Sequence, residues 1–219
     1  MAVFEHVSLP DAVARALRRR ILNNERTAET RLIEASLAAE FGVSRGTIRD
    51  AMRSLQAEGL IAIVPRRYSV VTRMSSEDAE DVCYARYVLE DASVCQGLED
   101  NAAALLDGLH ESVREMAAAA ADGDMDALVE GDTRFHERLI EVSGRPRLKD
   151  LWSMLNSQMG ALMRSEIERQ GIDLSEAAGR HRMLVDAVGS GDVIKVRDAL
   201  REHYMMGFPV HGPAARAGS

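Results

Sequence analysis

The 219-residue sequence has few aromatic side chains, two cysteines and no long apolar run. Aromatic residues make up 4% of the chain while alanine and leucine are abundant, a balance that favours helices over sheets. Cys83 and Cys95 form no metal or redox motif, and we expect both to be reduced, buried thiols. No segment approaches the roughly 18 apolar residues of a membrane span, and the N-terminus lacks the apolar core of a signal peptide. These absences predict a cytoplasmic protein with no membrane partner.

Lysine is missing from the first third of the chain, and charge is unevenly distributed. Residues 1–74 contain 12 arginines, no lysine and 8 acidic residues, so they carry +4 in a chain whose net charge is −8. The rest of the chain therefore carries −12. A basic end joined to an acidic body predicts two domains with different partners. We place them at 1–74 and 75–206, followed by a disordered Gly/Pro/Ala-rich tail at 207–219.

The basic end contains a helix-turn-helix pattern. Apolar periodicity predicts helices over 9–24 and 33–41, and Gly42 is suited to end the second of these. Ser44 has the side chain to cap a third helix, which we expect to stop near Gly59. Two helices joined by a tight turn that contains glycine form a helix-turn-helix.

A β-hairpin is predicted directly after the third helix. The runs 60–64 and 68–72 are rich in β-formers and flank the segment Pro65-Arg66-Arg67. A helix-turn-helix followed by a hairpin with a basic tip is a winged helix.

Three arginines, Arg45, Arg49 and Arg53, are spaced four residues apart and share the face of the third helix opposite its apolar stripe. Arginine binds guanine bidentately, and Arg45 and Arg49 occupy the first turns, where a recognition helix meets base edges. Ser44 and Thr47 can bond phosphate beside the amides of the helix N-terminus. The alternative is a solvated basic face on a core helix. The turn, the hairpin and the positive charge at the same end favour DNA binding.

The segment "LAAEFGVSRGTIRDAMRSLQAEGLI" resembles the winged-helix domain of the GntR family of bacterial transcription regulators, and the resemblance covers about residues 9–72. Two departures are Gly46-Thr47 in place of the frequent Thr-Pro, and a wing without the usual glycine at its tip. By resemblance, arginines of the third helix read the major groove, hydroxyls beside them hold the backbone, and the wing adds two arginines. The residues implied to contact double-stranded operator DNA are Ser44, Arg45, Thr47, Arg49, Arg66 and Arg67.

The acidic body is predicted to be helical throughout, because no strand-like alternation appears in it. The expected helices lie at 77–99, 102–121, 125–143, 147–170, 174–188 and 192–206. The predicted fold class is therefore mostly α. It combines an N-terminal winged helix-turn-helix, with three helices and a small β-hairpin, and a C-terminal all-α antiparallel helical bundle.

One aspartate and three histidines in the acidic body have the spacing of metal ligands. Asp132 and His136 are four residues apart on one helix and face the same way. His181 and His203 lie on consecutive helices that a "GSGD" turn folds into a hairpin, with the imidazoles at similar heights. Three imidazoles and one carboxylate suit a divalent ion such as Zn²⁺ or Ni²⁺. The alternative is that each histidine is a surface or hydrogen-bonded core residue.

Residues 77–206 resemble the all-helical FCD effector domain of the FadR subfamily of GntR regulators. The resemblance is carried by "RYVLEDA", by D-x-x-F-H at 132–136, and by H-x-x-L-x-x-A-x-x-x-G-D at 181–192. In metal-containing members the corresponding positions bind one divalent ion. The resemblance therefore implies a metal site formed by Asp132, His136, His181 and His203.

Arg86, on the first helix of this body, is a candidate contact for an effector. If it faces the same cavity, its guanidinium can bind the carboxylate of a small organic acid bidentately. The alternative is a surface arginine, or one that is bridged to Glu90 at i+4.

These features predict a homodimeric transcription regulator whose affinity for a pseudo-palindromic operator is controlled by a small organic acid bound beside the metal. A rival hypothesis is a metal-dependent enzyme fused to a DNA-binding domain, since an ion with open positions can activate water. No general base or nucleophile motif accompanies the cluster, which argues against an enzyme. A third hypothesis gives the metal a purely structural role.

Overall fold

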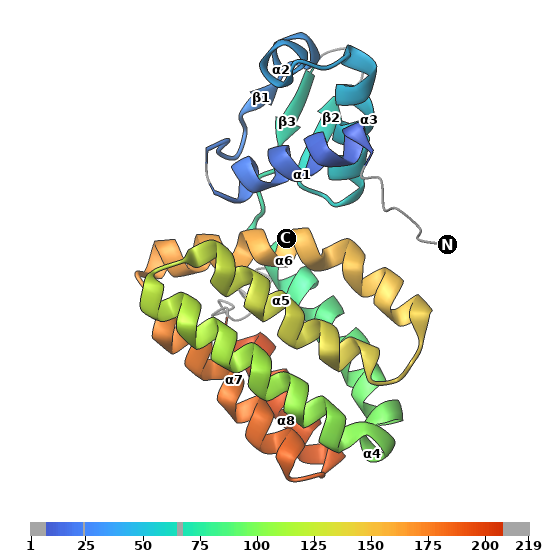
Figure 1. Ribbon diagram of the computed structural model, residues 1–219, viewed down its shortest axis with the longest axis vertical. Coiled ribbons are helices and arrows are strands. Elements are labelled where there is room, and N and C mark those ends of the chain that lie inside the picture. The colour runs from blue at the N-terminus through green and yellow to red at the C-terminus, as the bar shows by residue number, and fades with distance from the viewer. Residues whose placement is uncertain (1–7, 24, 65–67, 208–219) are drawn as a thin grey trace, which may run out of the picture. The chain divides into compact units, whose positions relative to one another are not determined.

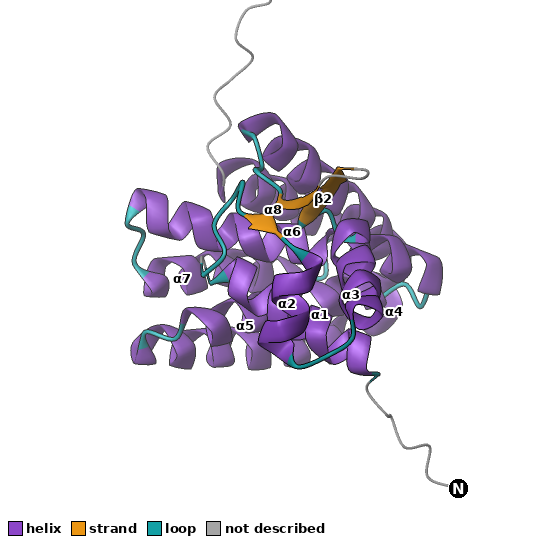
Figure 2. Ribbon diagram, turned by 90° about the horizontal axis from the view of Figure 1, so that it is seen from above, coloured by secondary structure: helices purple, strands orange, loops and turns teal. Residues whose placement is uncertain are grey.

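The computed structural model describes residues 8–23, 25–64 and 68–207, and for 168–170, 206 and 207 it describes the backbone alone. The chain divides into two compact units. The first consists of residues up to Met74 together with 154–161, and the second consists of the other residues from Ser75 onward. Strands, drawn in orange in Figure 2, occur in the described residues in one small sheet, and helices make up most of the remainder.

The first unit contains the predicted helix-turn-helix. Its helices are α1 (Leu9–Leu22), α2 (Glu34–Phe41) and α3 (Arg45–Ala57). The helix α2 ends at Gly42, whose φ of 66° lies in the left-handed region that glycine adopts without strain. Ser44 then caps α3 by accepting a hydrogen bond from the backbone N–H of Thr47.

The sheet of the first unit has three antiparallel strands in the order β1-β3-β2: β1 (Arg31–Leu32), β2 (Ile61–Val64) and β3 (Tyr68–Val71). The predicted hairpin is present as β2 and β3, with Ile61 opposite Val71. The sequence prediction missed β1, because two residues are too short to show an alternating pattern. The tip of the wing, with Arg66 and Arg67, lies outside the described residues.

One apolar core holds the first unit together. It is formed by the inward faces of its three helices and by single residues of its three strands. The α3 stripe of Ile48, Ala51, Met52 and Leu55 is almost completely buried, as its periodicity predicts. Burying each large aliphatic side chain contributes about 1.5–3 kcal/mol, so this stripe fixes which face of α3 points outward.

The second unit is an antiparallel helical bundle, as predicted. Its helices are α4 (Ser76–Asp122), α5 (Met125–Glu141), α7 (Leu174–Gly189), α8 (Val193–Gly207) and α6 (Pro146–Gln170), except for residues 154–161 of α6, which belong to the first unit. The long helix α4 runs beside α5, α7 and α8, and α7 and α8 form a hairpin (Figure 1). None of the described helices is long and apolar enough to cross a membrane. Residues 208–219, most of the predicted tail, lie outside the described residues.

The helix α4 is continuous, and the predicted break at 99–101 is wrong. This segment has no proline or glycine, and Asn and acidic residues cost less than about 1 kcal/mol each inside a helix. The Asn101 side chain also donates to the carbonyl of Gly97, 2.9 Å away, instead of ending the helix. The predicted start is correct, because Ser75 and Asp78 form a reciprocal capping box.

The two cysteines of α4 have different environments. Cys83 is buried, as predicted, and burial raises the pKa of its thiol to about 12. Cys95 is exposed, so the prediction of two buried thiols is wrong for this residue. Both are free thiols.

Candidate metal centre and DNA-binding surface

The N-terminal end of α3 presents the two hydroxyls that are predicted to hold phosphate. Ser44 is exposed and Thr47 half-buried, and their side-chain oxygens lie 2.9 Å apart. Both sit at the N-terminal turn of α3, where the helix dipole favours an anion. Their contact with the DNA backbone stays a prediction.

The three arginines of α3 are exposed and lie outside its buried stripe. Arg49 is held by Glu34 of α2, since its Nε and Nη2 donate to the two carboxylate oxygens at 3.0 and 2.7 Å. This hydrogen bond lowers the pKa of the Glu34 carboxyl. Arg53 Nη1 lies 3.6 Å from Asp50 Oδ1. Neighbouring acids thus compensate part of the repulsion within the arginine row. Spacing along α3 shows Asp50 but not Glu34, which comes from α2.

In the second unit, four potential metal ligands converge. Among the described residues, one oxygen or nitrogen from each of Asp132, His136, His181 and His203 lies within 4.8 Å of every other. The first two come from α5, the third from α7 and the fourth from α8. Asp132, His136 and His181 are buried, while His203 is half-buried. The structure therefore brings together the four residues that the sequence selected.

The ligand atoms of this cluster face one another. His181 Nε2 lies 2.9 Å from Asp132 Oδ1, and His136 Nε2 lies 3.2 Å from His203 Nε2 and 3.8 Å from Asp132 Oδ1. Zinc bonds of 2.0–2.1 Å in a tetrahedral arrangement place ligand atoms roughly 3.4 Å apart. The donor set and its spacing therefore fit a small divalent ion.

The outward nitrogens of two of these imidazoles are already occupied. His136 Nδ1 lies 2.8 Å from Glu90 Oε2, and His181 Nδ1 lies 3.2 Å from the backbone oxygen of Ala177. Both partners are acceptors, so each Nδ1 can donate and direct its Nε2 toward the centre of the cluster, where Nε2 of His181 lies against the Asp132 carboxylate.

Two side chains of the cluster, His203 and Asp132, are in the protonation state that a metal needs. Burial, with the neighbouring imidazoles of His181 and His136, holds the pKa of His203 well below its usual value, so this ring is neutral at pH 7. Burial alone would raise the pKa of Asp132. The hydrogen bond from His181 and the nearby positive charges outweigh it, so this pKa lies below the usual range. A neutral imidazole and an ionised carboxylate are the ligand forms of these side chains.

Family models match both units. Residues 81–205 match the FCD domain, and residues 9–71 match the gntR family of bacterial regulatory proteins. The chain belongs to the GntR family. Its FCD domain places it in the FadR subfamily, and the matched families consist of transcriptional regulators, not enzymes.

Curated relatives of this GntR regulator are similar over most of its length. An HTH-type transcriptional regulator in an unstable DNA locus of Streptomyces ambofaciens is 29% identical over 191 residues, which cover 85% of this chain and 78% of the relative. The gluconate operon transcriptional repressor of Bacillus subtilis (strain 168) is 24% identical over 196 residues, covering 88% and 80%. The hypothesis of an enzyme fused to a DNA-binding domain is therefore dropped.

Solved structures share the fold. Escherichia coli McbR/YncC has a TM-score of 0.74 at 22% sequence identity, covering 91% of this chain and 95% of that one. A GntR transcriptional regulator from Rhodococcus sp. RHA1 has a TM-score of 0.72 at 22% identity, covering 89% and 93%. At this level of identity the likeness shows the fold alone.

Arg86 of the FCD domain is completely buried. Its Nη2 lies 3.3 Å from Glu90 Oε1, and its guanidinium stacks 4.3 Å from the centre of the Trp152 ring. The bridge to Glu90, which the sequence left open as an alternative, is thus present. Contact between Arg86 and an effector stays a prediction.

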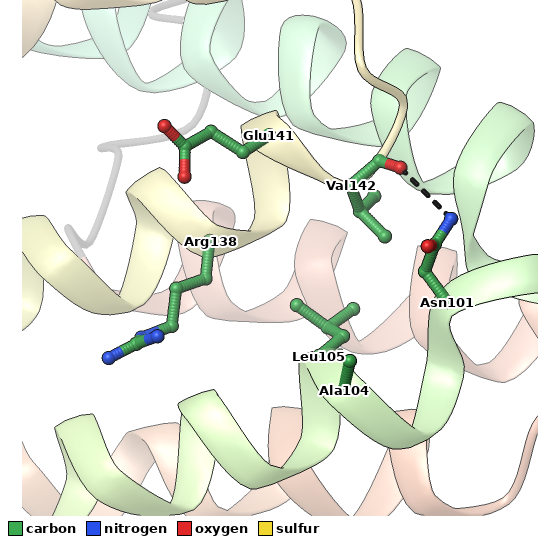
Figure 3. Close-up of a pocket in the computed structure, with 6 residues that line it drawn as sticks. All are labelled: Asn101, Ala104, Leu105, Arg138, Glu141 and Val142. Carbon is green, nitrogen blue, oxygen red and sulfur yellow. Dashed lines mark hydrogen bonds between the residues drawn. The ribbon is translucent and has the colours of Figure 1, made fainter.

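A shallow hollow of about 220 Å³ lies between α4 and α5, lined by Asn101, Ala104, Leu105, Arg138, Glu141 and Val142 (Figure 3). The guanidinium of Arg138, which lines this hollow, already donates to Ser112 and Glu111. The carboxylate of Glu141 is paired with Lys149. The hollow contains no residue of the metal-ligand cluster, so it does not match the site expected for an organic acid.

Proposed function

We propose that this GntR regulator binds one divalent metal ion in its FCD domain, and that a small organic acid bound beside the ion controls the affinity for operator DNA. One observation carries the proposal. Four ligand side chains from three helices bring their donor atoms within 4.8 Å of one another, and two of the imidazoles are held with Nε2 facing inward. Such outer hydrogen bonds are typical of metal-binding histidines.

The chemistry of the donor set favours Zn²⁺ or Ni²⁺, because imidazole nitrogens suit both ions. Asp132, His136, His181 and His203 would hold the ion and leave positions open on a five- or six-coordinate centre. When bound, the ion supplies a Lewis acid to which a carboxylate oxygen can bind. The half-buried side chain of His203 marks the more accessible part of the cluster.

A carboxylic acid is the effector class that an open position on a divalent ion favours. The positive charge of Arg86 helps to lower the pKa of Asp132. The Arg86 guanidinium is paired with Glu90. We propose that its charge also favours an anionic effector. One relative is named as the repressor of a gluconate operon, and gluconate is a hydroxy acid.

We further propose a homodimer on a pseudo-palindromic operator, because a single winged helix offers few base contacts. Arg45 and Arg49 would read the major groove, Ser44 and Thr47 would hold the DNA backbone, and Arg66 and Arg67 would contact DNA from the wing. An effector that binds two arrangements of the dimer unequally shifts their populations and thereby changes operator affinity.

The test is a titration of operator DNA, obtained by selection from random duplexes, with acetate, lactate, malate, citrate and gluconate as candidate effectors. We expect one class of acid to change the dissociation constant for metal-loaded protein and to have no effect after EDTA treatment. His136→Ala should abolish metal retention and the response while still binding the operator. The control, His110→Ala, changes an exposed histidine outside the cluster and should behave like wild type.

A different result would change the assignment. If the metal is present and stabilising but no acid alters operator affinity in either direction, the ion has a structural role alone and the effector proposal fails.

A further inference from the structure

We propose that Glu90 is a positioning residue for the metal site: its carboxylate holds His136 in the tautomer that carries the proton on Nδ1, and so presents Nε2 to the metal. The inference rests on the metal site proposed above. It adds a residue from α4, a helix that contributes none of the four ligands.

The Glu90 carboxylate is surrounded by hydrogen-bond partners and shielded from solvent. The residue is 0% exposed, and its Oε2 faces His136 Nδ1 at 2.8 Å. Its other oxygen, Oε1, lies 2.7 Å from Trp152 Nε1, 2.7 Å from the Tyr204 hydroxyl and 3.3 Å from Arg86 Nη2. Side chains of α4, α6 and α8 thus surround the carboxylate, and α5 supplies the histidine.

With these partners, each oxygen of the Glu90 carboxylate acts only as a hydrogen-bond acceptor. The indole and guanidinium N–H groups can only donate, so Oε1 must accept. An ionised carboxylate has no proton to offer, so the proton between His136 and Oε2 must be on Nδ1, and in the neutral form of the ring Nε2 is then unprotonated. The lone pair of His136 is then on Nε2, the atom that lies among the other ligand atoms, 3.2 Å from His203 Nε2.

The isosteric substitution Glu90→Gln should move the imidazole proton of His136 from Nδ1 to Nε2. Three donors converge on the position of Oε1, so the amide oxygen is expected there, which places the NH₂ group opposite His136 Nδ1. An NH₂ group donates, so Nδ1 would have to accept and the imidazole proton would move to Nε2. A protonated Nε2 has no lone pair for a metal. Loss of an outer-shell partner of this kind typically weakens metal binding by about 10- to 100-fold.

The experiment measures Zn²⁺ affinity by chelator competition at pH 8 for full-length wild type, Glu90→Gln and Asp91→Asn. The last variant makes the same chemical change one residue along α4, where the carboxylate pairs with Arg197, 2.7 Å away. We expect Glu90→Gln to bind about 10- to 100-fold more weakly than wild type and Asp91→Asn to stay within about threefold. Equal affinity of Glu90→Gln and wild type would overturn the positioning role.

A second measurement keeps the inference open to refutation if Glu90→Gln does not fold or if wild type takes up no zinc. Long-range ¹H–¹⁵N NMR of the metal-free wild type at pH 8 reports the tautomer of His136 directly. We expect the Nδ1–H form, and a dominant Nε2–H form would overturn the inference. Absence of zinc uptake by wild type would instead refute the proposed metal site, whereas the tautomer decides the role of Glu90 on its own.

Discussion

Arg45 and Arg49 lie one turn apart on the exposed face of α3, and their surroundings differ. Arg49 is bridged to Glu34, whereas Arg45 lies at the first position of the helix, directly after the Ser44 cap. Because a good arginine–guanine pair discriminates by about 1–3 kcal/mol, Arg45→Ala should weaken operator binding by that amount and relax sequence preference at one position per half-site. Competition of operator against random duplex DNA measures the preference.

The control for this substitution is Arg147→Ala, which removes an exposed arginine of α6 that pairs with Asp150. We expect the control to leave the ratio of operator to random-DNA binding unchanged. The assignment of α3 as the recognition helix is wrong if Arg45→Ala also leaves that ratio unchanged.

The two thiols give a second prediction at the scale of single residues. Burial raises the pKa of Cys83 to about 12, so almost no thiolate is present at pH 8, whereas Cys95 is exposed. A thiol reagent such as DTNB should therefore modify one cysteine per folded chain rapidly and the second only after denaturation. Mass spectrometry should find the native label on Cys95, and rapid labelling of Cys83 would contradict its burial.

The convergence of the four candidate ligands could be predicted from sequence because their spacing is local. Asp132 and His136 are one turn apart on a single helix, and a short turn folds His181 and His203 together. Glu90 could not be identified in this way. Its partners Trp152 and Tyr204 lie 62 and 114 residues away, and no periodic pattern connects positions so far apart. The ion pair with Arg86, at i+4, was its one local signal.

At the scale of helices, the contact between α4 and the end of α5 depends on one glycine. A β-carbon on Gly97 would lie 2.1 Å from the backbone oxygen of Val142, a distance that requires the backbone to move. We expect Gly97→Ala to lower the free energy of unfolding by about 1–3 kcal/mol, which is typical of overpacking. Urea denaturation followed by circular dichroism measures this change.

The matched control is Gly179→Ala on α7, where an added β-carbon meets no atom within 4 Å. Alanine is the better helix former, so this variant should be more stable than wild type by roughly 0.5–1 kcal/mol. Equal stability of the two variants would mean that α4 and α5 do not approach each other at Gly97.

Helix boundaries were predictable where a capping side chain or a glycine within a few residues determines them. Gly42, Ser44 and the Ser75 capping box act within a few residues, so the turn of the helix-turn-helix and the start of α4 could be located. The strand β1 and the continuity of α4 could not. The strand β1 forms because it pairs with β3. The helix α4 is continuous because its packing along the bundle outweighs the weak helix propensity of residues 99–101.

For the molecule as a whole, we predict a homodimer. Light scattering should give twice the chain mass of 24.0 kDa at working concentrations. The complex with operator should contain two chains per pseudo-palindromic site. A monomer both with and without DNA would contradict this prediction.

The central claim is that a metal ion joins three helices of the FCD domain. Its most direct test compares the melting temperature of purified protein with and without EDTA and measures the metal content of the same protein. An ion that binds only the folded state adds about 2.7 kcal/mol at a hundredfold excess over its dissociation constant, so chelation should lower the melting temperature. Protons compete for the imidazoles, so the difference should shrink as the pH falls, and at His203, whose pKa lies well below its usual value, this competition begins only below about pH 6.5. We expect one Zn²⁺ or Ni²⁺ per chain and a clear shift at pH 7.5. No stoichiometric metal, with superimposable melting curves, would contradict the claim.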